Sequence, residues 1–128
     1  MAIRIVRLGT DRARGEGVRF GTVRRPPRGV PKARFKTDNW YDVWLPALSP
    51  SESTRTSFMR STAPGRWTAF VRRYRSEMKR PEASQLLDAL AELSHTTNFS
   101  VGCYCEDETQ CHRSILWEIL AERGAKIG

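Results

Sequence analysis

Residues 103–113, CYCEDETQCHR, concentrate the side chains of this chain that could do chemistry. Thiols, an imidazole, a guanidinium and carboxylates all occur in this short segment. A cysteine at the start of a helix has its thiolate stabilised, which makes Cys111 a candidate nucleophile or redox thiol. The candidate catalytic residues are Cys111, His112 and Glu106, and the candidate ligand-binding residues of this segment are Arg113 and Cys105.

Zinc is one alternative for the segment, because cysteine and histidine are ligands that it prefers. Structural zinc sites usually use cysteines separated by about two to four residues together with a second, distant pair. Here Cys103 and Cys105 are separated by a single residue. We therefore expect an anion rather than a metal beside Arg113, at a helix start with partial positive charge and free amide groups. The sequence predicts no metal and no cofactor.

Other interpretations of the segment concern its acids and its thiols. A phosphatase-like phosphate loop does not fit, because residues 106–108 put negative charge where the phosphate would lie. Those acids could instead bind a cation, transfer protons or solvate the loop. Cys105 and Cys111 could form a reversible thiol pair, since they bracket a five-residue loop. Cys103 is expected to be a small buried hydrophobe deeper on the same strand face as Cys105.

A strand before this segment and a helix after it must position these groups. The apolar run Asn98–Cys105 predicts a strand that is buried on both faces. Helical spacing resumes from Cys111 to Arg123, and Gly124 stands where that helix would end. In open α/β sheets ligands bind at the carboxyl ends of strands, so we expect the segment to lie at such an end.

The rest of the chain supplies further elements in the predicted order β-β-α-α-α-α-β-α. Alternating apolar and basic residues predict strands over Ile3–Leu8 and Val18–Val23. Apolar residues at helical spacing predict amphipathic helices over residues 67–78 and from Pro81 through Leu93. These elements predict an α/β fold with a small, mostly parallel sheet covered by helices, in one compact domain over residues 1–128.

Two further helices are predicted from their capping residues. Asp38 is expected to cap a short helix that bears aromatic residues of the core and ends at Pro46. Ser49 is expected to cap a second helix that runs through about Arg60, with Glu52 three residues later completing a capping box.

The charge of the chain predicts an anionic partner. Lysine and arginine outnumber acidic residues 22 to 14, which gives a formal net charge of +8. Six basic residues and three prolines crowd the loop over residues 24–37, where Arg24 and Arg28 are candidate ligand-binding residues. The alternatives are a phosphate-contacting arm and a solvated connector. The sequence has no membrane-length apolar stretch, and its three clustered cysteines favour a reducing, cytoplasmic location.

Several motifs together resemble the DUF488 family of small bacterial and archaeal proteins. They are PRGV at 27–30, the loosely kept W-x-x-x-L-x-P-S pattern at 44–51, the W-x-x-F-x-x-x-Y spacing at 67–74, Cys105-Glu106 and Cys111-His112-Arg113. Many relatives carry an acidic residue and an arginine ahead of a tryptophan-proline-arginine-glycine run, whereas residues 23–29 read VRRPPRG here. The resemblance implies an α/β sandwich and names no substrate.

Two functions remain open from the sequence. The first is a small enzyme that acts on a phosphate-bearing or otherwise anionic ligand in a cleft at a strand end. The alternative is a non-catalytic nucleic-acid-binding module that holds phosphates with its arginine-rich loop. The partner is accordingly an anionic small molecule or a nucleic acid, and a membrane is not expected.

Overall fold

The structure is a computed structural model, and it describes residues 2–105 and 111–127. Glu106, predicted to be catalytic, lies outside the described residues together with the rest of segment 106–110. The predicted interactions of that acidic segment therefore stay predictions.

Four parallel strands form one sheet in the described part of the chain, in the order β1-β4-β2-β3. They are β1 (Ile3–Arg7), β2 (Val18–Gly21), β3 (Val43–Trp44) and β4 (Phe99–Cys103). All five residues of the central strand β4 are buried. Val101 of β4 is in register with Ile5 of β1 and Phe20 of β2. The predicted parallel sheet and the predicted buried strand near residues 98–105 are confirmed.

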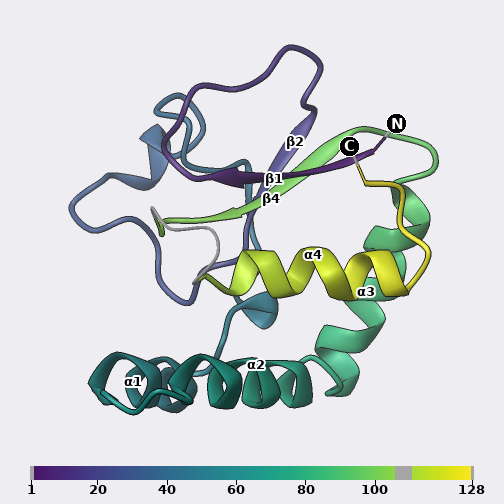
Figure 1. The fold of residues 1–128 in the computed structure, drawn as a ribbon. Helices are drawn as coiled ribbons and strands as arrows, with labels where there is room; N and C mark the ends of the chain where they lie inside the picture. The colour runs from purple at the N-terminus through teal and green to yellow at the C-terminus, as the bar shows by residue number, and fades with distance from the viewer. Residues whose placement is uncertain (1, 106–110, 128) are drawn as a thin grey trace.

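The helices lie on one side of this sheet (Figure 1). They are α1 (Glu52–Arg60), α2 (Arg66–Glu77), α3 (Pro81–Leu93) and α4 (His112–Glu122). In Figure 1, α4 runs directly beneath the sheet, and the antiparallel pair α1 and α2 lies farther away. The chain is thus an α/β protein, as its pattern of elements predicts.

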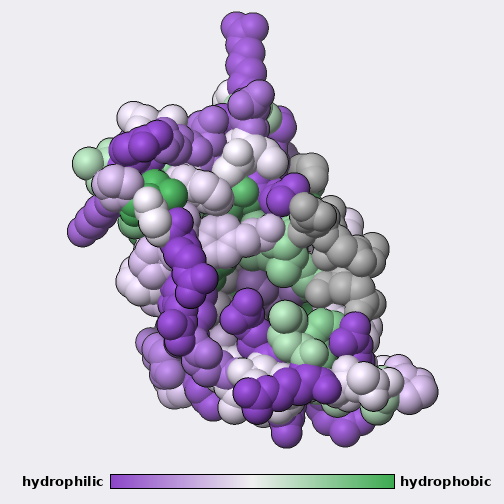
Figure 2. Space-filling view, turned by 90° about the vertical axis from the view of Figure 1, so that its left-hand side faces the viewer, coloured by the Kyte–Doolittle hydropathy of each residue, from purple (hydrophilic) through white to green (hydrophobic). Residues whose placement is uncertain are grey.

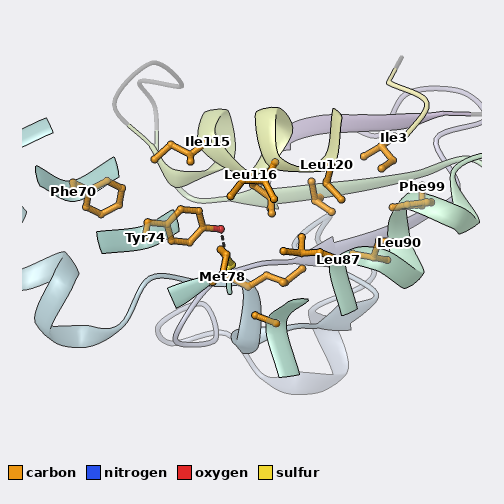
Figure 3. Packing of buried hydrophobic residues seen from close by; sticks show 14 residues of the cluster. Ile3, Phe70, Tyr74, Met78, Leu87, Leu90, Phe99, Ile115, Leu116 and Leu120 are labelled. Atoms are coloured by element: carbon orange, nitrogen blue, oxygen red, sulfur yellow. Dashed lines mark hydrogen bonds between the residues drawn. The ribbon is translucent and has the colours of Figure 1, made fainter. Parts of the chain in front are cut away.

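Apolar side chains from the helices and from β1 and β4 form the main core. Figure 3 shows Leu116 and Leu120 of α4 facing Tyr74 of α2 and Leu87 of α3. The Tyr74 hydroxyl is fully buried and donates a hydrogen bond of 2.6 Å to the carbonyl oxygen of Leu48. This bond satisfies a polar group that would otherwise be costly in the core.

The predicted cap of α1 is wrong by two residues. Ser51, not Ser49, is the N-cap, and its side chain accepts a hydrogen bond of 3.2 Å from the backbone N–H of Thr54. With Ser51 as the N-cap, Glu52 is the first residue of the helix and is not at the third position that a capping box requires, and the backbone N–H of Ser51 donates to the carboxylate of Glu77 on α2 at 2.9 Å. The carboxylate that accepts a bond from the N-cap N–H therefore comes from Glu77, which is distant in sequence, and not from Glu52 as the local pattern predicts.

The helix predicted after Asp38 is also wrong, because this segment turns and then forms the edge strand β3. Asn39 adopts a left-handed backbone conformation with φ of 63°, which ends any helix there. The carboxylate of Asp42 accepts a bond of 2.8 Å from the backbone N–H of Arg19, and the indole of Trp44 donates to the carbonyl of Val23. These long-range bonds stabilise strand pairing. Trp44 is half-exposed rather than a core residue.

The carboxyl ends of β1, β2 and β4 and the start of α4 meet at one end of the molecule, on the left in Figure 1. The predicted position of the 103–113 segment at a strand end is thereby confirmed for its described residues. None of the helices in the described part of the chain combines the length and apolarity that crossing a membrane requires.

Candidate functional site

A cleft of about 650 Å³ opens at this end of the sheet. Its walls are residues 7–10 after β1, 23–28 after β2, 103–105 at the end of β4, several residues of the 49–55 segment, Trp40 and His112. Figure 2 looks onto the end of the molecule that lies at the left of Figure 1 and shows hydrophilic side chains around a hollowed, more apolar middle. We call this space the arginine cleft, since Arg7, Arg24, Arg25, Arg28 and Arg55 line it.

The arginines of the cleft differ in how they are held. Arg24 donates to the carbonyl oxygen of Pro50 at 3.3 Å, so its guanidinium is positioned by the backbone, and it makes no ion pair with an acid among the described residues. Arg25 pairs with Glu52 at 2.9 Å. Within the described residues, the side chains of Arg28 and Arg55 have no hydrogen-bond or ion-pair partner. Both are exposed, and both remain available for an anion.

One carboxylate, that of Glu52, stands among the described residues that line the cleft. Five guanidinium groups against this single acid give the described walls a strong positive balance. Such a balance in a partly enclosed space concentrates anions from solution.

His112 forms part of the cleft wall at the first position of α4. Its Nε2 lies 2.6 Å from the carbonyl oxygen of Thr22, so Nε2 carries the proton and donates it to that oxygen. Nδ1 is then the lone-pair nitrogen, and it lies 3.7 Å from the sulfur of Cys111. Burial lowers the pKa of His112 to about 4, and the nearby charge of Arg113 acts in the same direction, so the imidazole is neutral near pH 7.

Cys111 is the N-cap of α4, as predicted, but it is buried and is not among the residues that line the cleft. Its sulfur contacts that of Cys103 at the end of β4. Cys105 is exposed and lines the cleft. The predicted pairing of Cys105 with Cys111 is therefore wrong. The strand carries Cys103 inward, as expected for a buried residue, and it is this thiol that reaches Cys111.

Arg113 is buried and donates a hydrogen bond of 2.8 Å to the carbonyl oxygen of Cys105. It is not among the lining residues of the arginine cleft, and its Nε has no hydrogen-bond partner in the described part of the structure. Its contact holds the end of the β4 segment against α4. A role in binding a ligand stays a prediction for this residue.

An aromatic wall of the cleft was not predicted from the sequence. The rings of Trp40 and Tyr104 meet edge to face with centroids 5.8 Å apart, and both residues line the cleft. The Tyr104 hydroxyl donates to the carbonyl oxygen of Arg25 at 2.9 Å, and burial raises its pKa. The rings thus tie the β4 end, the basic loop and the turn before β3 into one wall.

A buried ion pair behind the cleft holds these loops in place. Arg19 donates to the carboxylate of Glu16 at 2.8 Å and to the carbonyl oxygens of Thr10 and Asn39 at 2.9 and 2.8 Å. Ser100 of β4 also donates to Glu16, at 2.6 Å. Burial raises the pKa of Glu16, but the bonds from Arg19, Ser100 and a backbone N–H outweigh it and lower that pKa to about 2.

The structure brings together four of the seven predicted site residues, Arg24, Arg28, Cys105 and His112, in the lining of one cleft. Cys111 lies behind the wall, Arg113 braces it, and Glu106 lies outside the described residues. Sequence reasoning missed Arg7 and Arg55. Each is an isolated arginine in an ordinary strand or helix pattern, so no local signal marks it.

The fold and this cleft define a small α/β protein with a parallel sheet and an arginine-lined cavity at its strand ends. The family model described as "Active DUF488-N3 subclade" matches residues 3–124. The chain belongs to the DUF488 family, as its motifs indicate. No curated protein and no solved structure gave a significant match.

Proposed function

We propose that the protein is a small enzyme that binds a phosphate-bearing or otherwise anionic ligand in the arginine cleft. The observation that carries the proposal is the set of five arginines, against one described carboxylate, in a single cleft at the carboxyl ends of parallel strands. Ligands of open α/β sheets collect at such ends. Guanidinium groups match the oxygens of phosphate with forked hydrogen bonds.

Two arginines of the cleft are the best candidates for direct contact with the anion. Arg28 and Arg55 have no partner among the described residues, so a ligand need not displace a carboxylate to reach them. Arg24 adds positive charge that backbone carbonyls already orient. The start of α1 is not the anion site, because the carboxylate of Glu77 occupies its capping position.

Catalysis in this proposal rests on charge stabilisation by the arginines and on groups in the cleft wall and directly behind it. Fixed positive groups in a partly enclosed site stabilise negative charge that develops on a ligand. Cys111, His112 and Glu106 remain the proposed catalytic residues. The contact between Cys111 and the lone-pair nitrogen of His112 supports treating these two as a unit.

Calorimetric titration with inorganic phosphate, pyrophosphate and adenosine monophosphate tests the binding step. Replacing Arg28 or Arg55 with alanine removes a charge-assisted hydrogen bond, which is expected to weaken binding by about 1.5 to 3 kcal/mol each. The matched control is Arg72→Ala, an exposed arginine of α2 outside the cleft lining. Equal weakening by the control, or no binding of any of the three anions at low salt, would count against the proposal.

The second candidate is a nucleic-acid-binding module, favoured by the exposed basic loop beside the cleft. Arg28, Lys32 and Lys36 are exposed, and none of these side chains has a polar partner among the described residues. A nucleic acid along this loop would bind with an affinity that falls steeply with salt, because each neutralised phosphate releases counterions.

Fluorescence anisotropy with single- and double-stranded oligonucleotides at two salt concentrations separates the candidates. For a module, the double variant Lys32→Ala and Lys36→Ala should weaken binding of every sequence and reduce the salt slope by about two. For a cleft enzyme, that variant should leave the binding of adenosine monophosphate unchanged. Oligonucleotide binding that ignores salt would exclude the module.

A further inference from the structure

The geometry points to a zinc site formed by Cys103, Cys111 and His112 in the wall of the arginine cleft. The sequence spacing argues against a zinc site, because Cys103 and Cys105 are too close together on a strand. The fold removes this objection by leaving Cys105 out and bringing Cys103 next to the start of α4. The inference does not depend on which ligand the cleft takes, but it replaces the role of Cys111 and His112 as a thiol–base pair with that of metal ligands.

The three donor atoms lie close enough together to bind one ion. One ligand atom of each residue, sulfur or ring nitrogen, lies within 4.8 Å of the other two. The sulfur of Cys111 is 3.7 Å from Nδ1 of His112. A tetrahedral zinc ion with ordinary Zn–S and Zn–N bonds separates its sulfur and nitrogen ligands by about 3.6 Å. This pair is therefore already spaced as two ligands of one ion.

The environment prepares His112 as a ligand. Its Nε2–H donates to the carbonyl oxygen of Thr22 at 2.6 Å, and this bond fixes both the tautomer and the orientation of the ring. Histidines that bind metals usually make such a bond with the other ring nitrogen. The lone pair of Nδ1 is thereby directed toward Cys111 before any ion binds.

The charge balance of the three side chains also favours binding of a divalent ion. Binding of zinc would release the two thiol protons to solvent, so two thiolates, a neutral imidazole and Zn²⁺ would have no net charge. All three residues are buried, with exposures of 1%, 2% and 7% for Cys103, Cys111 and His112. A neutral set of this kind can be buried at much lower cost than separate thiolates.

A disulfide between Cys103 and Cys111 is the competing explanation of the sulfur contact. Their Cα atoms are 7.9 Å apart. Disulfides rarely join Cα atoms more than about 7 Å apart unless the backbone moves. The backbone of both residues is held in place, on β4 and at the start of α4, so an unstrained disulfide would need the backbone to move. Binding one zinc ion would need only the two side chains to turn, so that the sulfur atoms, which are in direct contact, separate to about 3.8 Å.

Three protein ligands leave one position of a tetrahedral ion for a small molecule, as in catalytic zinc sites. Cys103 and His112 line the arginine cleft, so that position would be available to water or to an oxygen of an anion in the cleft. The site would then place a Lewis acid beside the guanidinium groups.

The first test uses the unmodified chain. Freshly reduced protein is incubated with zinc, gel-filtered, and its zinc content is measured; one equivalent per chain is expected. Alkylation followed by mass spectrometry should label Cys105 with or without zinc, whereas Cys103 and Cys111 should be labelled at least tenfold more slowly with zinc bound. Reduced protein that takes up no zinc, or zinc that protects Cys105 alone, overturns the inference.

The second test uses variants to identify which residues bind the zinc ion. Cys103→Ser, Cys111→Ser and His112→Gln should each lose at least tenfold in zinc affinity, whereas the matched controls Cys105→Ser and His95→Gln should bind as the unmodified chain does. Unchanged affinity in the first three variants, or loss in the Cys105 control, overturns the site. If a buried variant does not fold, the alkylation pattern of the unmodified chain decides. Purified protein with a Cys103–Cys111 disulfide that cannot bind zinc after reduction also overturns it.

Discussion

The buried Glu16–Arg19 ion pair makes a quantitative prediction about stability and pH. Glu16 and Arg19 side chains are almost completely buried, with exposures of 2% and 0%. The folded state lowers the pKa of Glu16 from 4.5 to about 2. Because one pKa unit corresponds to about 1.4 kcal/mol, the ionised carboxylate should contribute about 3 kcal/mol to folding at neutral pH.

The direction in which stability changes with pH follows from the lowered pKa of Glu16. The unfolded chain binds a proton at Glu16 more readily than the folded chain does, so the contribution is complete well above pH 4.5. It is lost as the pH falls from about 4.5 toward 2. Glu16→Gln, which cannot ionise and leaves Arg19 buried with a neutral partner, should destabilise the fold by about 3 kcal/mol at neutral pH.

Urea unfolding followed by tryptophan fluorescence measures this contribution at several pH values. The difference in unfolding free energy between the unmodified chain and Glu16→Gln should shrink steadily below pH 4.5. Glu52→Gln is the control, since its pair with Arg25 is exposed and should contribute less than about 1 kcal/mol. A difference for Glu16→Gln that stays constant between neutral pH and pH 3 would show that packing, and not charge, causes the loss.

Three other substitutions and one control test the hydrogen bonds and packing of the fold, each by urea unfolding. Tyr74→Phe leaves the buried carbonyl of Leu48 without its donor and should cost about 1 to 3 kcal/mol; an unchanged midpoint would contradict this. Gly102→Ala would place a Cβ 2.6 Å from a backbone oxygen of β1 and should cost at least about 1 kcal/mol, whereas Gly65→Ala meets nothing within 4 Å and should be nearly neutral. Ser51→Ala removes the cap of α1 and should cost about 1 kcal/mol, less than Tyr74→Phe if burial decides the ranking.

Elements with a strong local pattern could be predicted from the sequence. The helix over residues 67–78 and the strand near 98–105 were found because their apolar residues recur with the period of one element. The segment 38–45 was mistaken because its partners, Arg19 and Val23, lie about twenty residues earlier in the chain. Local propensity contains no information on those bonds.

In the candidate site, too, features with a local pattern could be predicted, and features that depend on tertiary contacts could not. The helix start at Cys111 and its place at a strand end could be derived from spacing and from the geometry of parallel sheets. The contact between the sulfur atoms of Cys103 and Cys111 could not be derived, because it depends on where β4 ends and on how it packs against α4. Arg55 reaches the cleft through the packing of α1, which no pattern within the helix reveals.

The central position of β4 has a consequence for the order in which the chain can fold during synthesis. β1 has no partner strand among the described strands except β4, and the two are separated by about three quarters of the sequence. β1 must therefore wait, unpaired, until the ribosome has released Cys103. Loop closure over so many residues makes such pairing slow, and the exposed strand needs protection meanwhile. The arginine cleft, which is lined by residues at the ends of both strands, therefore cannot be complete before β4 has paired with β1.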